Sequence, residues 1–160
     1  MAAAVTAADW IRSATAIGAH QMRNAPELAA QTFKKGAPLV DSGGYLKEAT
    51  SAAAVDIIGF ALHDGGNGSS SGDTTVDYLT TEANPVFMGK LCGASPHTLA
   101  ETDRNVAYGL ASTSNFWYVD FDEGTAGHKS VTILEFVDAV GTSSGWVKFT
   151  LNLYGNPYVD

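Results

Sequence analysis

The amino-acid sequence predicts a mainly β protein: a compact β-barrel or sandwich of short strands with one short helical turn, preceded by an extended N-terminal arm. Three observations lead to this prediction. Turn-forming residues recur roughly every ten residues from residue 30 onward, a spacing typical of sandwiches and barrels. Apolar and polar residues alternate over 145–153, as in a half-buried strand. Residues 1–29 are rich in alanine and show no such alternation.

This change in composition divides the 160-residue chain into an arm, residues 1–29, and one β domain, residues 30–160. In the arm, Thr6 and Asp9 match a capping box, so a turn or two of helix is expected there, and Pro26 would end it. Ordering the backbone costs about 1–2 kcal/mol per residue, which the few apolar side chains of the arm cannot offset. We therefore expect the arm to contribute little to the fold and to be ordered by a partner.

Short β segments separated by glycine-containing turns make up the rest of the chain. The segments predicted as strands are 31–34, 38–40, 45–48, 55–62, 74–79, 86–91, 106–110, 115–120, 130–137 and 145–153. In the last of these, Val147, Phe149 and Leu151 share one face and Trp146 lies on the other. The segment 130–137 is apolar on both faces, which suits a strand between a core and a neighbouring subunit.

Two segments interrupt this pattern. Thr98 and Glu101 match a capping box, so a single helical turn is expected at 98–101. Residues 63–73 are almost entirely glycine, serine, aspartate and asparagine, and they are expected to form a solvated loop.

Charge and cysteine content exclude several classes of protein. The chain has 9 Lys and Arg against 17 Asp and Glu, a net charge of −8, so a nucleic-acid-binding surface is not expected. The first 35 residues are mildly basic and the remainder strongly acidic, which fits an arm that docks on another acidic surface. No apolar stretch approaches the roughly 20 residues that span a bilayer, so no membrane partner is expected. Cys92 is the only cysteine, which excludes a disulfide scaffold.

A search for catalytic and metal-binding patterns gives no strong candidate. The glycines of 63–73 miss the spacing of nucleotide-binding loops, and no Gly-x-Ser-x-Gly motif occurs. The four histidines lack metal-ligand spacing and are expected in solvent. Asp120, Asp122 and Glu123 begin like a calcium-binding loop but lack its later ligands, which leaves a weak cation site as a minor alternative. We expect no catalytic residue, no metal and no cofactor, although carboxylates paired in space remain open.

Three consecutive aromatic residues, Phe116, Trp117 and Tyr118, lie in a predicted strand and direct rings to both faces. A core on one side and a subunit contact on the other would cover both. An internal strand of a sandwich would do so equally well. A platform for sugar or single-stranded nucleic acid is a third possibility, although the acidic composition argues against nucleic acid.

Several segments form a recognisable series along the chain: 31–40 (QTFKKGAPLV), 41–49 (DSGGYLKEA), 57–62 (IIGFAL), 86–91 (VFMGKL), 117–120 (WYVD) and the strand pair within 130–153. Taken in this order, they resemble the small β-barrel decoration, or cement, proteins of tailed-bacteriophage capsids. The resemblance implies a structural virion protein that binds the outside of the capsid and stabilises the shell across capsid subunits. Its partners would be the major capsid protein and further copies in a homotrimer. Synthesis would take place in the cytoplasm of the bacterial host, and no catalytic residue is implied.

This hypothesis assigns roles to two groups of residues. Phe116, Trp117 and Tyr118 would lie near a subunit contact. The arm would anchor the protein on the capsid through Trp10, Ile11, Arg12, Ile17, Arg23 and Leu28. Two other classes remain as alternatives: a receptor- or carbohydrate-binding β module of a phage tail or head fibre, and a small β-barrel enzyme that uses carboxylates.

Overall fold

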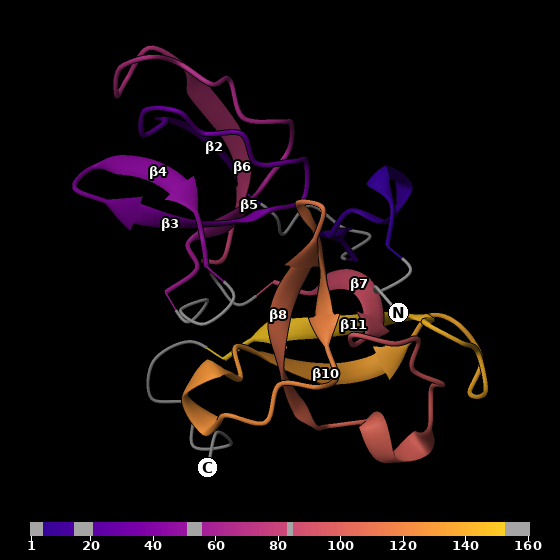
Figure 1. The fold of residues 1–160 in the computed structure, drawn as a ribbon. Coiled ribbons are helices and arrows are strands. Elements are labelled where there is room, and N and C mark those ends of the chain that lie inside the picture. Colours follow the sequence, from indigo (N-terminus) through magenta and orange to yellow (C-terminus); the bar gives the residue numbers. More distant parts are fainter. Residues whose placement is uncertain (1–4, 15–20, 51–55, 83–84, 153–160) are drawn as a thin grey trace.

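The computed structural model of the chain describes residues 5–14, 21–50, 56–82 and 85–152. Within these ranges the protein is mainly β, as predicted, and its strands form two sheets, one above the other in Figure 1. Every predicted strand segment except 31–34 contains a strand. Residues 31–34 form no strand: the Phe33 carbonyl accepts the Gly65 N–H and the Gln31 carbonyl accepts the Asn67 N–H, and the chain then turns at Gly36.

The lower sheet in Figure 1 is a closed barrel. Its strands, in order around the barrel, are β7 (Phe87–Cys92), β11 (Trp146–Leu151), β10 (Val131–Phe136), β8 (Ala107–Thr113) and β9 (Phe116–Asp120). The barrel closes because β9 also pairs with β7, in parallel, at Leu91 and Cys92. The other neighbours are antiparallel. Closure satisfies backbone groups that an open sheet would leave at its edges.

The second sheet has five strands, in the order β2 (Met22–Pro26), β6 (Thr75–Thr80), β5 (Gly59–Ala61), β3 (Pro38–Ser42) and β4 (Tyr45–Glu48). All of these pairs are antiparallel. Its two end strands approach each other, because Glu27 forms an isolated bridge with Leu46 and the Leu28 N–H donates to the Leu46 carbonyl. The sheet is therefore curled rather than flat.

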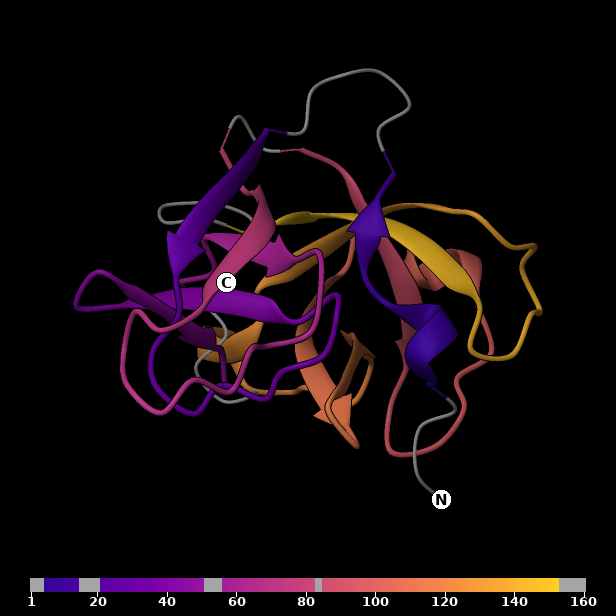
Figure 2. The same ribbon diagram turned by 90° about the horizontal axis from the view of Figure 1, so that it is seen from above.

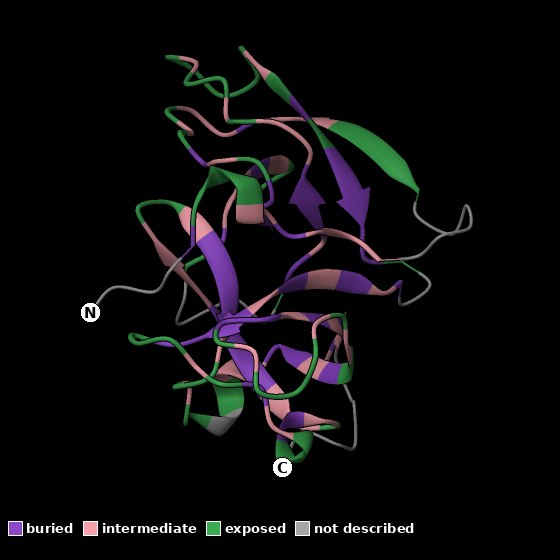
Figure 3. Ribbon diagram, turned by 90° about the vertical axis from the view of Figure 1, so that its right-hand side faces the viewer, coloured by how far each residue is buried: buried purple, intermediate pink, exposed green. Residues whose placement is uncertain are grey.

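Three phenylalanine rings join the two sheets into one core. Phe60 of β5 lies 4.6 Å from Phe87 of β7 and 6.3 Å from Phe149 of β11, measured between ring centroids. All three are fully buried. The alternation predicted for 145–153 is confirmed, with Val147, Phe149 and Leu151 buried, and Figure 3 shows buried and half-buried positions alternating along the strands. Burial of such rings is the largest stabilising contribution expected in a domain of this size.

Short 3-10 turns are the helical elements of the described residues: η1 (Ala7–Asp9), η3 (Glu101–Asp103) and η4 (Ala126–His128). The Thr6–Asp9 capping box is confirmed. The turn predicted at 98–101 lies slightly later, at η3, because Thr98 is held in a bridge with Ser143 and cannot cap it. The Asp103 carboxylate accepts the Ala100 N–H instead, at 2.9 Å.

The N-terminal segment is extended, as predicted, but its described part is packed on the two sheets. β1 (Arg12–Ser13) pairs with β7, and β2 pairs with β6 along its whole length (Figure 2). The expectation that residues 1–29 contribute little to the fold is therefore wrong for these residues. Strand addition supplies the hydrogen bonds that an isolated segment would lack.

Ile11 is the clearest case, since only 1% of its surface is exposed. Two glycines make room for it. A Cβ on Gly89 would lie 3.2 Å from Ile11 Cγ1 and 3.3 Å from Phe149. A Cβ on Gly36, whose φ is +86°, would lie 2.7 Å from the Ile11 nitrogen. Close approach of the segment thus depends on small residues at both positions.

The strand β9 is covered on both faces by this same chain. Trp117 is 4% exposed and belongs to the main core, whereas Tyr118 packs with Val5 and Cys92 in a second cluster. Phe116 is half-buried. An internal strand, one of the alternatives considered from the sequence, therefore explains why the aromatic side chains lie on both faces. A subunit contact is not needed to explain this pattern.

The strand β10 departs from simple alternation at a bulge. Val131 and Ile133 are buried, but the register with β11 shifts between Ile133 and Glu135, so Leu134 has no partner and is 37% exposed. Beyond the bulge Val137 is 45% exposed. The two-sided apolar pattern of 130–137 reflects this shift, because a bulge moves the following residues to the opposite face.

Trp117 also connects the two sheets through a hydrogen bond, its indole Nε1 donating to Glu48 Oε1 at 2.7 Å. Trp117→Phe should lower the free energy of unfolding by about 1–3 kcal/mol, because a carboxylate is left without its donor. Urea denaturation measures this loss. Trp146→Phe is the matched control, since the Trp146 indole makes no hydrogen bond to the residues that the structure describes. Equal losses in both variants would contradict the assignment.

Candidate interaction surface

The outer face of the barrel around β7 carries the residues that the N-terminal segment brings together. Alternation places Met88 and Lys90 of β7 outward, and the register sets Lys90 beside Trp146 and Met88 beside Arg12. Opposite residues of an antiparallel pair point to the same face. Arg12, Lys90 and Trp146 therefore share one surface, and all three are half-buried.

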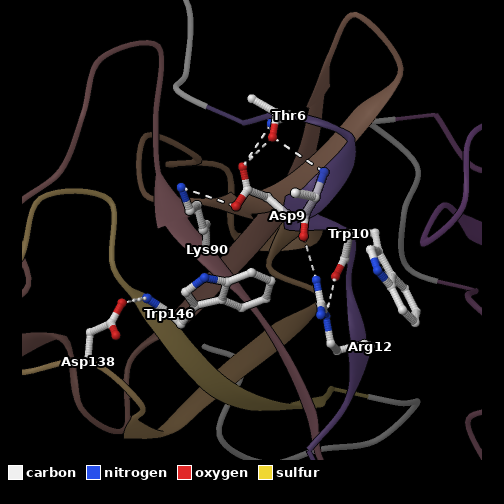
Figure 4. A network of polar contacts seen from close by, with 8 residues as sticks. Thr6, Asp9, Trp10, Arg12, Lys90, Asp138 and Trp146 are labelled. Carbon is white, nitrogen blue, oxygen red and sulfur yellow. Dashed lines mark hydrogen bonds and ion pairs between the residues drawn. The ribbon is translucent and has the colours of Figure 1, made fainter.

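Aromatic and cationic side chains alternate in a stack on this surface. The Arg12 guanidinium lies 4.8 Å from the centre of the Trp146 ring and 4.6 Å from that of Trp10, and Figure 4 shows it between the two indoles. The Lys35 ammonium lies 4.1 Å from the Trp10 ring centre. Each such contact contributes about 0.5–1 kcal/mol at a partly exposed site. We call Trp146, Arg12, Trp10 and Lys35 the cation–π stack.

Hydrogen bonds hold the stack in place. Arg12 Nε donates to the Trp10 carbonyl at 3.1 Å and Nη2 to the Ala8 carbonyl at 2.6 Å. Asp9 fixes the preceding turn, because its carboxylate accepts the Thr6 N–H at 2.9 Å and lies 3.3 Å from Lys90 Nζ (Figure 4). Burial alone would raise the pKa of Asp9, but the bonds from Thr6 and Lys90 outweigh it and lower the pKa.

Two cations of the stack have no carboxylate partner within the described ranges. Arg12 contacts only carbonyl oxygens and rings, and Lys35 only the Trp10 ring. Lys90 by contrast is paired with Asp9, and Lys34 with Asp64 at 3.3 Å. Two unpaired positive charges in contact with the same tryptophan ring are unexpected in a protein of net charge −8. They can accept an anionic group from outside.

A pocket of about 140 Å³ opens beside the stack. It lies between the turn η1, the residues before Gly36, the loop at 64 and the beginning of β9. Its lining residues are Ala7, Lys34, Lys35, Asp64 and Phe116. The lining therefore combines apolar residues with two lysines and one aspartate.

The structure distributes the predicted anchor residues over several places. Trp10 and Arg12 meet in the stack, whereas Ile11 is a core residue and cannot act as an anchor. Arg23 lies on the other sheet, with Nη2 2.7 Å from Glu82, and Leu28 is half-buried beside Leu46. Ile17 lies outside the described residues.

Two residues of this surface, Trp146 and Lys35, were not predicted from the sequence. The alternation over 145–153 already set Trp146 on the face opposite Val147 and Phe149. A tryptophan that a strand directs away from the core is a signal that could have marked it. Nothing in the sequence around Lys35 indicates that it meets Trp10.

A second polar cluster was also missed. Asp103 is 3% exposed, and its carboxylate accepts from the Ala100 N–H at 2.9 Å, the Tyr108 hydroxyl at 2.9 Å and His97 Nε2 at 2.8 Å. The His97 ring stacks on Phe121, with centroids 3.6 Å apart. The expectation that every histidine is solvated is therefore wrong for His97, which fixes the loop before η3 to the barrel.

The Asp103 cluster predicts a loss of stability in acid. Burial raises the pKa of Asp103, but the bonds from Ala100, His97 and Tyr108 outweigh it, so the pKa lies below its ordinary value. A lowered pKa contributes stability that is complete above the unfolded value of about 4 and disappears as pH falls through the folded value. We expect the melting temperature to fall steeply below about pH 4. In Asp103→Asn the fall should be shallower, and an unchanged slope would contradict this origin.

The acidic turn after β9 is occupied by backbone donors. Asp122 Oδ2 accepts the Ala94 N–H at 2.8 Å, and Asp120 Oδ1 accepts the Asp122 N–H at 3.0 Å. Burial, with the nearby Asp122 and Glu123 charges, raises the pKa of Asp120. In the described parts of the chain no three His, Cys, Asp or Glu side chains are placed to hold a metal ion. No helix there is long and apolar enough to cross a membrane.

Comparisons with known proteins add no relative. No protein-family model matches the chain, and no curated protein matches it in sequence.

Proposed function

We propose that the protein is a structural virion protein that binds the outside of a phage capsid and stabilises the shell across capsid subunits. The observation that carries the proposal is the half-exposed stack of Trp10, Arg12 and Trp146. Tryptophan and arginine dominate the energetics of protein–protein interfaces. The sequence resemblance to capsid decoration proteins supplies the identity of the partner, the major capsid protein.

The architecture supports such a role. A shell is reinforced when each added copy touches several subunits, so that modest contacts combine through multivalency. A rigid body is needed for this, and here a closed barrel and a second sheet share one core. The stack lies on that body, since its members come from the N-terminal segment, β11 and the loop before β3. Its side chains are thereby held ready for a partner, which lowers the entropic cost of binding.

A receptor- or carbohydrate-binding module is the alternative, and the stack favours it less. Sugars bind tryptophan by stacking on the flat face of the ring. The guanidinium of Arg12 already covers one face of each indole, and the Lys35 ammonium contacts Trp10 as well. We propose no enzymatic activity: His97 and Asp103 form a pair, but the ring of His97 lies under Phe121 and its partner is a buried carboxylate.

Copy number separates a decoration protein from a fibre module. In purified particles we expect a number of copies comparable to that of the major capsid protein, as judged by quantitative gel staining. A few copies per particle would support the fibre alternative.

In binding assays with undecorated shells, Trp10→Ala with Arg12→Ala should abolish decoration, whereas Arg23→Ala, on the other sheet, should not. Full occupancy by the double variant would refute the role of the stack.

The resemblance also implies a homotrimer, which we include in the proposal. Sedimentation at micromolar concentration should give three times the mass of one chain. The mass of a single chain, both free and on the particle, would refute it.

A further inference from the structure

We propose that the pocket beside Lys35 binds the carboxylate of an aspartate or glutamate side chain carried by a partner protein. This inference goes beyond the proposed function, because it assigns a class of ligand to one pocket from the residues that line it. It does not depend on the partner being a capsid protein. The site consists of the pocket residues together with Trp10, whose ring lies under the Lys35 ammonium.

The residues around the pocket carry a positive charge that their neighbours do not balance. Lys34 is matched by Asp64, with Nζ and Oδ2 3.3 Å apart. Lys35 is different, because only its backbone N–H reaches Asp64, at 2.9 Å, while its ammonium has no carboxylate partner among the described residues. The residues of the pocket thus carry one net positive charge, and the unpaired Arg12 also contacts the Trp10 ring. This is an unmatched positive site on an acidic molecule.

The size and polarity of the pocket suit a single acidic side chain. Its volume of about 140 Å³ accommodates one side chain rather than an extended ligand. Phe116 and Ala7 supply apolar wall, which would contact the methylene groups of an entering glutamate. Partial removal of water strengthens the attraction between a carboxylate and Lys35, because the effective dielectric constant falls.

The net charge of the chain limits which anions can approach the pocket. A phosphate backbone would bring many negative charges toward a chain that itself carries −8, and the repulsion would oppose binding. A single acidic side chain on a protein avoids this, and Trp10, Arg12 and Trp146 provide the contact area around it. The partner is therefore an acidic protein segment.

Nuclear magnetic resonance tests the proposal with a capped hexaglutamate peptide as the probe. The three tryptophans provide an internal comparison: the Trp10 indole lies at the site, whereas the Trp117 indole is buried and bonded to Glu48. We expect the Trp10 indole and the Lys35 amide signals to shift with a dissociation constant of about a millimolar, and the Trp117 indole to stay unchanged. Raising the salt concentration should weaken the shifts.

Three variants test whether hexaglutamate binds at Lys35. Lys35→Gln should weaken binding about threefold, the range of a partly exposed ion pair. Lys47→Gln is the control, because Lys47, in β4, also lacks a carboxylate partner among the described residues but lies away from the pocket. Asp64→Asn should tighten binding, since it frees Lys34 while the amide oxygen still accepts the Lys35 N–H.

Several outcomes would overturn the proposal. Equal losses in Lys35→Gln and Lys47→Gln would show general attraction to a polyanion, and shifts caused by capped hexaglutamine would show that charge is not recognised. Inorganic phosphate that shifts the same signals at lower concentration would assign the pocket to phosphate. Signals that move on dilution of the protein alone would assign it to a second copy of this chain.

Discussion

Replacing Ile11 with alanine should lower the free energy of unfolding by about 2–4 kcal/mol, although Ile11 lies close to the N-terminus. Its side chain is almost completely buried beside Phe149 and Gly89, so the substitution leaves a cavity that rigid barrel strands cannot fill. Part of the attachment of β1 to β7 would be lost with it. Urea denaturation followed by tryptophan fluorescence measures the change.

Met22→Ala is the control for Ile11→Ala. Met22 belongs to the same N-terminal segment, but 69% of its surface is exposed, so we expect a loss below about 0.5 kcal/mol.

By the same reasoning, deletion of residues 1–29 should abolish cooperative folding, because it removes Ile11, β1 and β2 together. If the truncated chain melts at the same temperature as the full chain, residues 1–29 contribute little to the fold, and the packing described above is contradicted.

Asp103→Ala should lower the free energy of unfolding by about 3–5 kcal/mol, because it leaves buried donors without an acceptor. The Ala100 N–H, His97 and the Tyr108 hydroxyl all converge on this carboxylate. Thermal melting at neutral pH measures the loss. Glu101→Ala is the control, since its ion pair with Arg104 is exposed and should contribute little. A loss in Asp103→Ala as small as in Glu101→Ala would mean that water replaces the carboxylate without cost.

The body of the fold could be predicted from the sequence because its strands carry local signals. Alternation over 145–153 and the turns that bound each segment depend only on neighbouring residues, and the strands follow them. The N-terminal segment carries no such signal. Ile11 is buried because Gly36 and Gly89 leave space for it, and neither glycine is near it in sequence. A single sequence does not reveal pairings of this kind.

The candidate surface was predicted in part for the same reason. Trp10 and Arg12 were recognised as binding residues from their type, which is a local property. Their neighbours Trp146 and Lys35 come from distant parts of the chain, and only the pairing of β1 with β7 and of β7 with β11 brings Trp146 to Arg12. Phe116 was expected near a subunit contact because its strand has two apolar faces. The second face is instead covered by Val5 and Cys92, which are distant in sequence.

On the ribosome, the two N-terminal strands emerge long before the strands that they pair with. β1 can pair only after β7 has been synthesised, and β2 only after β6. β7 itself pairs with β11, which ends at Leu151. The core that both sheets share can therefore be completed only after Phe149 of β11 has been synthesised, and contacts so distant in sequence set a folding time on the order of milliseconds to seconds. A nascent chain interrupted before Trp146 lacks β11, the strand between β7 and β10, and cannot close the barrel.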